Sequence, residues 1–492
     1  MPTLTQQLAR WAAGLSPGDL PASVGARARL QQVHLAGLLR SLQQRPLATA
    51  LQGYAILQQA ALGALLELDD TLLGGRTGIG AVPAAWANAG GHTLGELDAA
   101  IVAGNEVGGR VGLATLLGPD LTGFNPAVVA VAAATTAGRL RGLSPDQLAH
   151  AIAIAAGGAG DGRRAAVVGG HALAVLAGRA ASWGAQAAAL AAGGVTGDLD
   201  IFDDIDGPLA ARSWLVLRNA FTGLGTAWLT ETLAFKHTPG PLAAQIAVQG
   251  VHEILRRHVK AADKRLRVDQ LARVEVRTGA LGCALGRSQP PRDPAGVARS
   301  ARDLIGVLVV EHELGPTQLE AGWLRERGDA VAEVAGRVSF VHDEERTVRL
   351  LEQLSEVAVP LFAGVSLRTL AQVGQRAGDA WGLPAWGPAG VLALLRLRPD
   401  QIRARLRDSS RDLSDARLDE FQYRYDTEVK VFTTRGGSWP ERRTVPEGSP
   451  GWSWQDTVAR SCARLPEGHG ERALGAGRGE AAPAWVAEVV GT

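Results

Sequence analysis

Cysteine is almost absent from this chain, since only Cys283 and Cys462 occur among its 492 residues. Two cysteines exclude a disulfide-rich scaffold and a cysteine-based zinc module. An excess of charge of either sign is missing too, because the chain has 50 Lys and Arg residues and 49 Asp and Glu residues. This balance provides no broad electrostatic surface for nucleic acid or an anionic membrane, so we expect neither as a partner.

Long apolar segments and targeting signals are also missing. No run of 18 or more apolar residues passes without a glycine, polar or charged break, so no membrane-spanning helix is expected. Residues 1–15 are typical of an amphipathic helix and lack the basic start, apolar run and cleavage site of a signal peptide. We therefore expect a soluble cytoplasmic protein, and its length suggests two or three domains.

Lysine is scarce, and arginine supplies most of the positive charge. The four lysines are Lys236, Lys260, Lys264 and Lys430. In a chain that otherwise uses arginine, a lysine is of interest as a functional candidate. The alternative is that each is an ordinary solvated surface residue.

The first half of the chain, residues 1–265, has helical periodicity. Apolar residues recur at intervals of three and four over residues 94–102, as on one face of an amphipathic helix. Ser144 followed by Pro145 is a helix start, with a cap residue ahead of an apolar run. Small residues dominate other segments, such as residues 180–185, and they allow helices to approach closely. This half is predicted to be a tightly packed helical bundle.

The pattern changes near residue 273. Residues 273–278, 337–342 and 427–433 alternate between apolar and polar side chains, which predicts strands with one buried face. A helix is predicted between the first two strands, at about residues 298–312. A further short helix is expected near residues 454–464.

The predicted architecture is therefore mainly α with an α+β lid: a large all-helical domain plus a smaller α+β domain. We assign residues 1–268 and 436–492 to the helical domain and residues 269–435 to the lid. Residues 346–420 form a helical insertion within the lid.

Familiar cofactor and metal motifs are missing. The glycines from Gly78 follow no strand, and Pro83 takes the third glycine position of a dinucleotide fingerprint. No Walker lysine, HExxH sequence or paired-cysteine motif occurs. Glu311, His312 and Glu313 are neighbours on a predicted helix and point in different directions. No metal site is expected.

A series of segments does occur in one particular order. These are residues 65–71 (LLELDDT), 82–87 (VPAAWA), 95–110, 123–126 (GFNP), 142–152, 177–184 (AGRAASWG) and 235–239 (FKHTP). In this order and spacing the chain resembles the MmgE/PrpD family, which includes 2-methylcitrate dehydratase, cis-aconitate decarboxylase and iminodisuccinate epimerase. The resemblance covers residues 10–345 and resumes near Thr427, and residues 95–110 are the best single match.

The resemblance implies a homodimer whose subunits have a large helical domain and a smaller α+β lid, with the active site in the cleft between them. It also implies cofactor-free chemistry beside the carboxylates of a small substrate. That chemistry is proton abstraction followed by loss of water or carbon dioxide, or by reprotonation.

Part of the family's site carries over to this chain. The lysine that precedes a proline-containing loop is retained as Lys236, next to His237. The aspartate-rich family motif matches a cluster of carboxylates and one hydroxyl, namely Glu67, Asp69, Asp70 and Thr71.

Other family positions are changed. The histidine expected six residues after the motif threonine falls at Thr77, beside Arg76, and a second family histidine falls at Asn125. The lysine before the Ala-Gly-Arg segment falls near Leu173, two residues from His171. Threonine and asparagine can hydrogen-bond, but they cannot take a proton near pH 7 as a neutral histidine can.

Two functional hypotheses fit these residues. In the first, the protein is a divergent lyase or isomerase in which Lys236 or His237 moves the proton. Arg76 and Asn125 would then hold the developing negative charge. The motif carboxylates and Thr71 would orient the reacting groups. In the second, it is a catalytically silent homologue that acts as a binding or scaffold protein. The catalytic candidates are Lys236, His237, Thr71, Asp70 and Glu67, and the substrate-binding candidates are Arg76, Thr77, Asn125 and His171.

Each candidate also has a structural alternative. Asp69, Asp70 and Thr71 would suit a helix cap, and Lys236 with His237 would suit a solvated helix end. His171 would suit a hydrogen-bonded core position. His92 and Glu96 are expected to be an exposed pair, and Asn105-Glu106 with Arg110 a structural ion pair.

Overall fold

Local sequence determines where the helices of the first half begin. The computed structural model describes residues 1–118, 124–160, 170–204, 207–262, 265–287, 293–381 and 411–491. Thr3, Thr93 and Ser144 each cap a helix in a reciprocal capping box, in which the cap and the third helical residue satisfy each other's backbone N–H groups. The helix predicted after Ser144 is confirmed.

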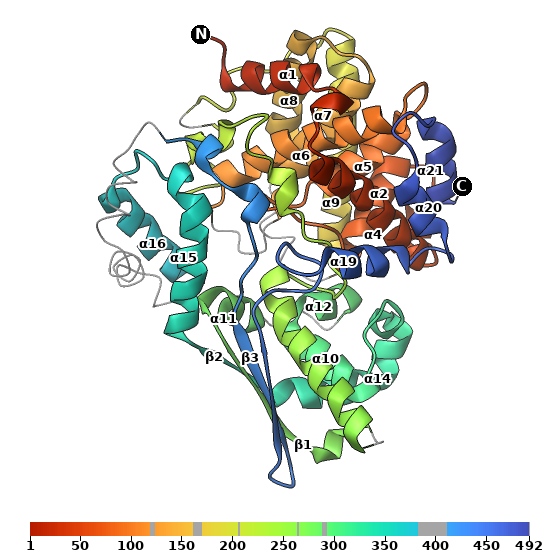
Figure 1. Ribbon diagram of the computed structural model, residues 1–492, viewed down its shortest axis with the longest axis vertical. Coiled ribbons are helices and arrows are strands. Elements are labelled where there is room, and N and C mark those ends of the chain that lie inside the picture. Colours follow the sequence, from red (N-terminus) through yellow and green to blue (C-terminus); the bar gives the residue numbers. More distant parts are fainter. Residues whose placement is uncertain are drawn as a thin grey trace.

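Nine α-helices lie in residues 1–192 of the described chain and form the upper part of the molecule in Figure 1. They are α1 (Leu4–Gly14), α2 (Ala22–Leu42), α3 (Pro46–Ala50), α4 (Ala55–Leu65), α5 (Gly78–Ala87), α6 (Leu94–Ala114), α7 (Pro126–Leu140), α8 (Pro145–Gly158) and α9 (Ala172–Ala192). Helix α7 is central and packs against α5, α6, α8 and α9.

Small residues allow these helices to pack closely, as predicted. A Cβ atom on Gly184 of α9 would lie 2.1 Å from the carbonyl oxygen of Ala130 on α7. A Cβ atom on Gly80 of α5 would lie 2.3 Å from the carbonyl oxygen of Val129. Both distances are below van der Waals contact, so only glycine fits where α5 and α9 cross α7.

A four-stranded sheet forms the lower part of the described chain (Figure 1). Its order is β2-β1-β3-β4, with β1 parallel to β2 and antiparallel to β3, and β3 antiparallel to β4. The strands are β1 (Leu271–Thr278), β2 (Val338–His342), β3 (Thr427–Thr433) and β4 (Ser438–Arg443). The three predicted strands are confirmed, and β4 extends the sheet beyond residue 435.

Helices accompany the sheet. Helix α10 (Leu242–Ala262) packs against β3 and β4. Between β1 and β2 lie α11 (Ala280–Arg287), α12 (Pro294–Arg299), α13 (Ala301–Glu311) and α14 (Ala321–Gly336). Helix α13 confirms the helix predicted near residues 298–312. The fold class is therefore mainly α with a small α+β part, as predicted.

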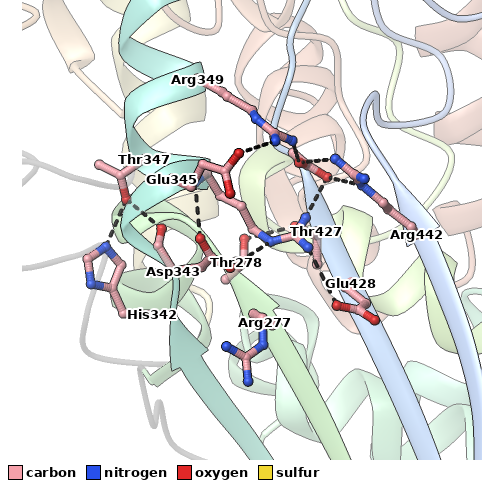
Figure 2. Close-up of polar contacts among 12 residues, drawn as sticks. Arg277, Thr278, His342, Asp343, Glu345, Thr347, Arg349, Thr427, Glu428 and Arg442 are labelled. Atoms are coloured by element: carbon pink, nitrogen blue, oxygen red, sulfur yellow. Dashed lines mark hydrogen bonds and ion pairs between the residues drawn. The ribbon is translucent and has the colours of Figure 1, made fainter. Parts of the chain in front are cut away.

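The region predicted as a helical insertion begins with α15 (Glu344–Leu361) and α16 (Leu367–Trp381). Residues 382–410 of the insertion lie outside the described part. Asp426, just before β3, accepts hydrogen bonds from Arg346 and Arg349 of α15 and from Arg442 of β4 at 2.5–3.0 Å. Figure 2 shows Arg349 of α15 and Arg442 of β4 extending toward each other. This network joins α15 to the end of the sheet.

The C-terminal segment returns to the helical bundle. It contains α19 (Trp454–Cys462), α20 (His469–Gly475) and α21 (Ala482–Val490), and all three pack against α2. Helix α19 confirms the predicted late helix. No helix of the described residues is long and apolar enough to cross a membrane.

Candidate active site

The carboxylate motif lies in the turn that follows α4. Helix α4 ends at Leu65, and Glu67 then adopts a φ of 53°, a left-handed conformation that few non-glycine residues take. The turn directs the next residues back into the bundle. As a result Asp69 and Asp70 are 1% and 2% exposed.

A short antiparallel bridge brings this motif to Lys236. The N–H of Thr71 donates to the carbonyl of Ala234 at 3.0 Å, and the N–H of Ala234 donates to the carbonyl of Thr71 at 2.7 Å. Antiparallel pairing places the residue two before Thr71 opposite the residue two after Ala234. Asp69 therefore faces Lys236.

Asp69 accepts from two cations. Arg76 binds it bidentately through Nε at 2.5 Å and Nη2 at 2.6 Å, and the Nζ atom of Lys236 lies 3.2 Å from Oδ1. Burial alone would raise the pKa of Asp69, but the charges of Arg76 and Lys236 and their hydrogen bonds lower it. The Asp69 carboxylate is thus held in its charged form between two buried cations.

Asp70 has the opposite electrostatic environment. Burial and the neighbouring charge of Asp69 raise the pKa of Asp70 to about 7, against 3.8 for a free aspartate. Its single side-chain hydrogen bond among the described residues comes from Nε2 of Gln31 at 2.6 Å. Two adjacent carboxyl groups with pKa values shifted apart are a common arrangement for general acid–base chemistry.

Glu67 completes the carboxylate group. Its Oε1 atom lies 3.7 Å from Nη1 of Arg76, which is too long for a hydrogen bond. Within the described chain, both of these buried atoms lack a hydrogen-bond partner. Arg76 therefore clamps Asp69 on one side and keeps a free donor toward Glu67.

A chain of amides links the motif to α5 and α6. Gln31 accepts from Nδ2 of Asn105 at 2.9 Å, and the hydroxyl of Thr77 donates to Oδ1 of Asn105 at 2.7 Å. Thr77 is fully buried and lies just before α5. Asn105 thus belongs to the candidate site rather than to the predicted ion pair. The remaining pair, Glu106 with Arg110, is structural as predicted, with 2.5 Å between its charged atoms.

His237 lies beside Lys236 and packs edge-on against His34 of α2, with 5.6 Å between the ring centroids. His34 contacts the carbonyl of Leu68 through Nε2 at 2.8 Å and the hydroxyl of Ser461 through Nδ1 at 3.2 Å. Burial lowers the pKa of His34 to about 3, and burial together with its charged and histidine neighbours lowers the pKa of His237 as well. Both rings are neutral near pH 7.

The remaining candidates make no side-chain hydrogen bond to this cluster among the described residues. Asn125 caps α7 by accepting from the N–H of Ala127, and its amide donates to the hydroxyl of Thr115. The preceding residue, Phe124, places its ring 5.6 Å from the Arg76 guanidinium carbon. His171 is exposed just before α9. The hydroxyl of Thr71 contacts the carbonyl of Gly75 at 3.2 Å and is half-buried.

Three structural alternatives are wrong. Lys236 is 2% exposed and paired with Asp69, so it is not at a solvated helix end. The side chain of Asp69 binds buried cations and that of Asp70 accepts from Gln31, so neither caps a helix. His171 is exposed, so it is not a core histidine. The pairing of His92 with Glu96, at 3.7 Å, agrees with the prediction.

Sequence reasoning missed Gln31 and His34, which lie on α2, and Ser461 and Arg464, which lie near the C-terminus. Arg464 belongs here because its Nη2 atom donates to the carbonyl of Lys236 at 3.4 Å. One signal was available: residues 31–34 place three polar side chains within four positions of a helix whose neighbours are apolar. No signal of this kind marks Ser461 or Arg464. Among the described residues, no group of three or more His, Cys, Asp or Glu side chains could hold a metal ion.

The fold and the site define a mainly helical protein with a buried carboxylate–cation cluster at the end of α4 and a small α+β part. Residues 48–213 match the family model described as the MmgE/PrpD N-terminal domain. A search of curated proteins finds no match. The matched range contains every candidate from Glu67 to His171, whereas Lys236 and His237 follow it.

Proposed function

We propose that this protein is a cofactor-independent lyase or isomerase of the MmgE/PrpD type. It transfers a proton on a small molecule activated by a carboxylate or carbonyl group, as one step of dehydration, decarboxylation or isomerisation. The family includes lyases and dehydratases, which supports the class of reaction. We further propose a homodimer that acts in the cytoplasm and binds neither nucleic acid nor membrane.

One observation carries the proposal: the adjacent carboxyl groups of Asp69 and Asp70 have pKa values shifted in opposite directions. A group with a pKa of about 7 exists in both protonation states near neutral pH, so Asp70 suits both the removal and the return of a proton. The lowered pKa of His237 makes it a weaker base in the same range. These contacts favour Asp70 over His237 as the group that exchanges the proton.

The cations would stabilise the charge that develops when a proton leaves a carbon next to a carboxylate or carbonyl. The Lys236 ammonium lies 3.2 Å from Asp69, and Arg76 keeps Nη1 without an acceptor among the described residues. Fixed donors in a buried site are effective at this task because they need no reorganisation.

The test is exchange of carbon-bound hydrogen in deuterated water with a panel of di- and tricarboxylic acids, followed by NMR. The wild-type protein is expected to incorporate deuterium at an α-carbon. D70N and K236M are each expected to slow exchange by at least about 100-fold, within the range that general acid–base groups contribute. K430M is the matched control, because Lys430 is 40% exposed and pairs with Glu428 on β3. Exchange that persists unchanged in both site variants would contradict the proposed roles.

The alternative function, a catalytically silent binding or scaffold protein, has one observation in its favour. Asp69 is fully engaged by Arg76 and Lys236, as expected of a buried ionic cluster that only stabilises the fold. In that case the folded wild-type protein exchanges no carbon-bound hydrogen with any acid of the panel. The variants D70N and K236M would then alter stability alone.

A further inference from the structure

The C-terminal segment encloses the residues on either side of Lys236. The N–H of Phe235 donates to the carbonyl of Gly448 at 2.8 Å. Gly448 has a φ of +81°, and a Cβ atom there would lie 2.0 Å from the Phe235 carbonyl oxygen and 2.9 Å from the His237 ring. Only glycine allows this approach, which packs the segment directly onto His237.

Arg464, just after α19, points into the same region. Its Nη2 atom donates to the carbonyl of Lys236 at 3.4 Å, and α2 approaches its Cβ so closely that a Cβ on Gly37 would lie 2.7 Å away. Its Nη1 atom is buried and has no hydrogen-bond partner in the described chain. Burial without a carboxylate lowers the pKa of Arg464 to about 10.

Glu447, a buried acidic residue of the C-terminal segment, is already paired. Glu447 binds Arg443 at 2.8 Å and also Arg460. Arg464 is therefore a half-buried cation whose enclosed Nη1 atom and charge have no carboxylate partner among the described residues. Such a charge is costly unless an anion joins it, because burial removes the hydration of the guanidinium group.

His237 supplies a second group without a partner. Both of its ring nitrogens are buried, and neither has a hydrogen-bond partner among the described residues. The charge of Arg464 further disfavours protonation of this ring. A neutral imidazole offers one N–H donor, so His237 can donate to an anion that Arg464 also holds.

We infer that Arg464 and His237 form a binding subsite for a small oxyanion, such as a carboxylate group of the substrate, beside Lys236. The inference rests on the proposed function for the identity of the ligand, but not for the existence of the subsite. Arg464 suits the task because its planar fork matches the two oxygens of a carboxylate. The C-terminal segment would thereby contribute to substrate binding although it follows the sheet in the chain.

Isothermal titration calorimetry of the full-length protein with succinate, and separately with inorganic phosphate, tests the subsite. We expect the wild type to bind succinate, and R464M to bind it at least tenfold more weakly at constant ionic strength. Phosphate binding with the same dependence on Arg464 would show a general oxyanion site, whereas succinate binding alone would show preference for carboxylates. R472M is the matched control, because Arg472 is 58% exposed and pairs with Glu488 in the same segment.

Equal succinate affinity in wild type and R464M, or no binding of either anion to the wild type, would overturn the inference. If R464M does not fold, R464K replaces it, because lysine keeps the positive charge but lacks the planar guanidinium fork. The affinity of R464K for succinate is expected to be at least threefold lower than that of the wild type. An unchanged affinity would refute the subsite. Hydrogen exchange separates this outcome from the proposed function. Anion binding without hydrogen exchange would contradict the proposed function and support the subsite. Hydrogen exchange that is unchanged in R464M would support the proposed function and contradict the subsite.

Discussion

At the scale of single residues, Gly78 determines how close α5 can come to the carboxylate motif. Gly78 is the first residue of α5, and a Cβ atom there would lie 2.1 Å from Oδ1 of Asp70 and 2.5 Å from Nε2 of Gln31. The absence of a side chain lets Asp70 and Gln31 meet beneath the helix start. The hydrogen bond between them therefore depends on a residue that makes no polar contact through a side chain.

Replacement of Gly78 by alanine is expected to destabilise the protein by about 1–3 kcal/mol, the usual cost of overpacking. The gain in helix propensity from Gly to Ala, about 1 kcal/mol, is too small to offset the overlap with Asp70. Urea unfolding followed by circular dichroism measures the change. Gly328 in α14 has no neighbouring atom within 4 Å of its virtual Cβ, so G328A is the control and should be neutral or stabilising. Equal unfolding midpoints for G78A and G328A would contradict this prediction, because they would show that the structure relieves the overlap between the new Cβ atom and Asp70 at little cost.

At the scale of an element, α15 is joined to the sheet by charge. Arg346 of α15 contacts Asp343, Asp426 and Glu428, so one helix residue bridges the start of its own helix and strand β3. Although burial opposes it, hydrogen bonds from Arg442 and the charges of the three arginines lower the pKa of Asp426. Asp426 is 6% exposed and is the common partner of three cations.

The variant D426N is expected to loosen α15 and to destabilise the protein by about 2 kcal/mol, since it leaves three guanidinium groups around a neutral amide. Hydrogen–deuterium exchange read by mass spectrometry should show faster exchange in peptides from residues 344–361. E345Q is the control, because Glu345 is 73% exposed and its pair with Arg349 is expected to contribute less than about 1 kcal/mol. Unchanged exchange in α15 would mean that apolar packing alone holds the helix.

At the scale of the whole molecule, the sequence predicts elements far better than it predicts the site. Alternation and capping signals act locally, so strand β1 and the helix after Ser144 can be read from a few neighbouring residues. Strand propensity does not predict that β4 pairs with β3, because Ser438–Arg443 contains Pro440 and four polar residues. Edge strands tolerate proline and charge, which removes the usual strand signal.

The candidate site was predictable only where residue type was itself unusual. Lys236 stood out because lysine is rare in this chain, and the acidic run Asp69-Asp70 stood out in an apolar stretch. Gln31 and Arg464 reach the same cluster from α2 and from the C-terminal segment. Such contacts arise from tertiary packing, and no spacing in the sequence encodes them. The environment of Asp70 is likewise set by burial, which a motif alone does not report.

That burial has a consequence for the stability of the whole protein. The folded-state pKa of Asp70, about 7, lies above its unfolded value of 3.8, so the folded protein binds the proton more tightly. This contribution to stability is complete below about pH 4 and is lost as pH rises through 7. The lowered pKa of Asp69 gives a contribution to stability that is lost as the pH falls, which is the opposite dependence. A variant is therefore needed to separate the effect of Asp70 from that of Asp69.

The variant D70N removes the titrating group and retains its size and an oxygen that can accept from Gln31. Relative to D70N, the free energy of unfolding of the wild type is expected to fall by roughly 3–4 kcal/mol between pH 4 and pH 8, at about 1.4 kcal/mol per unit of pKa shift. Urea titrations of both proteins at intervals of half a pH unit, followed by tryptophan fluorescence, give the difference curve. A curve that is flat across this range would mean that Asp70 is ionised in the folded protein at pH 5. Asp70 could then not exchange a proton near neutral pH, and the acid–base role would pass to Lys236.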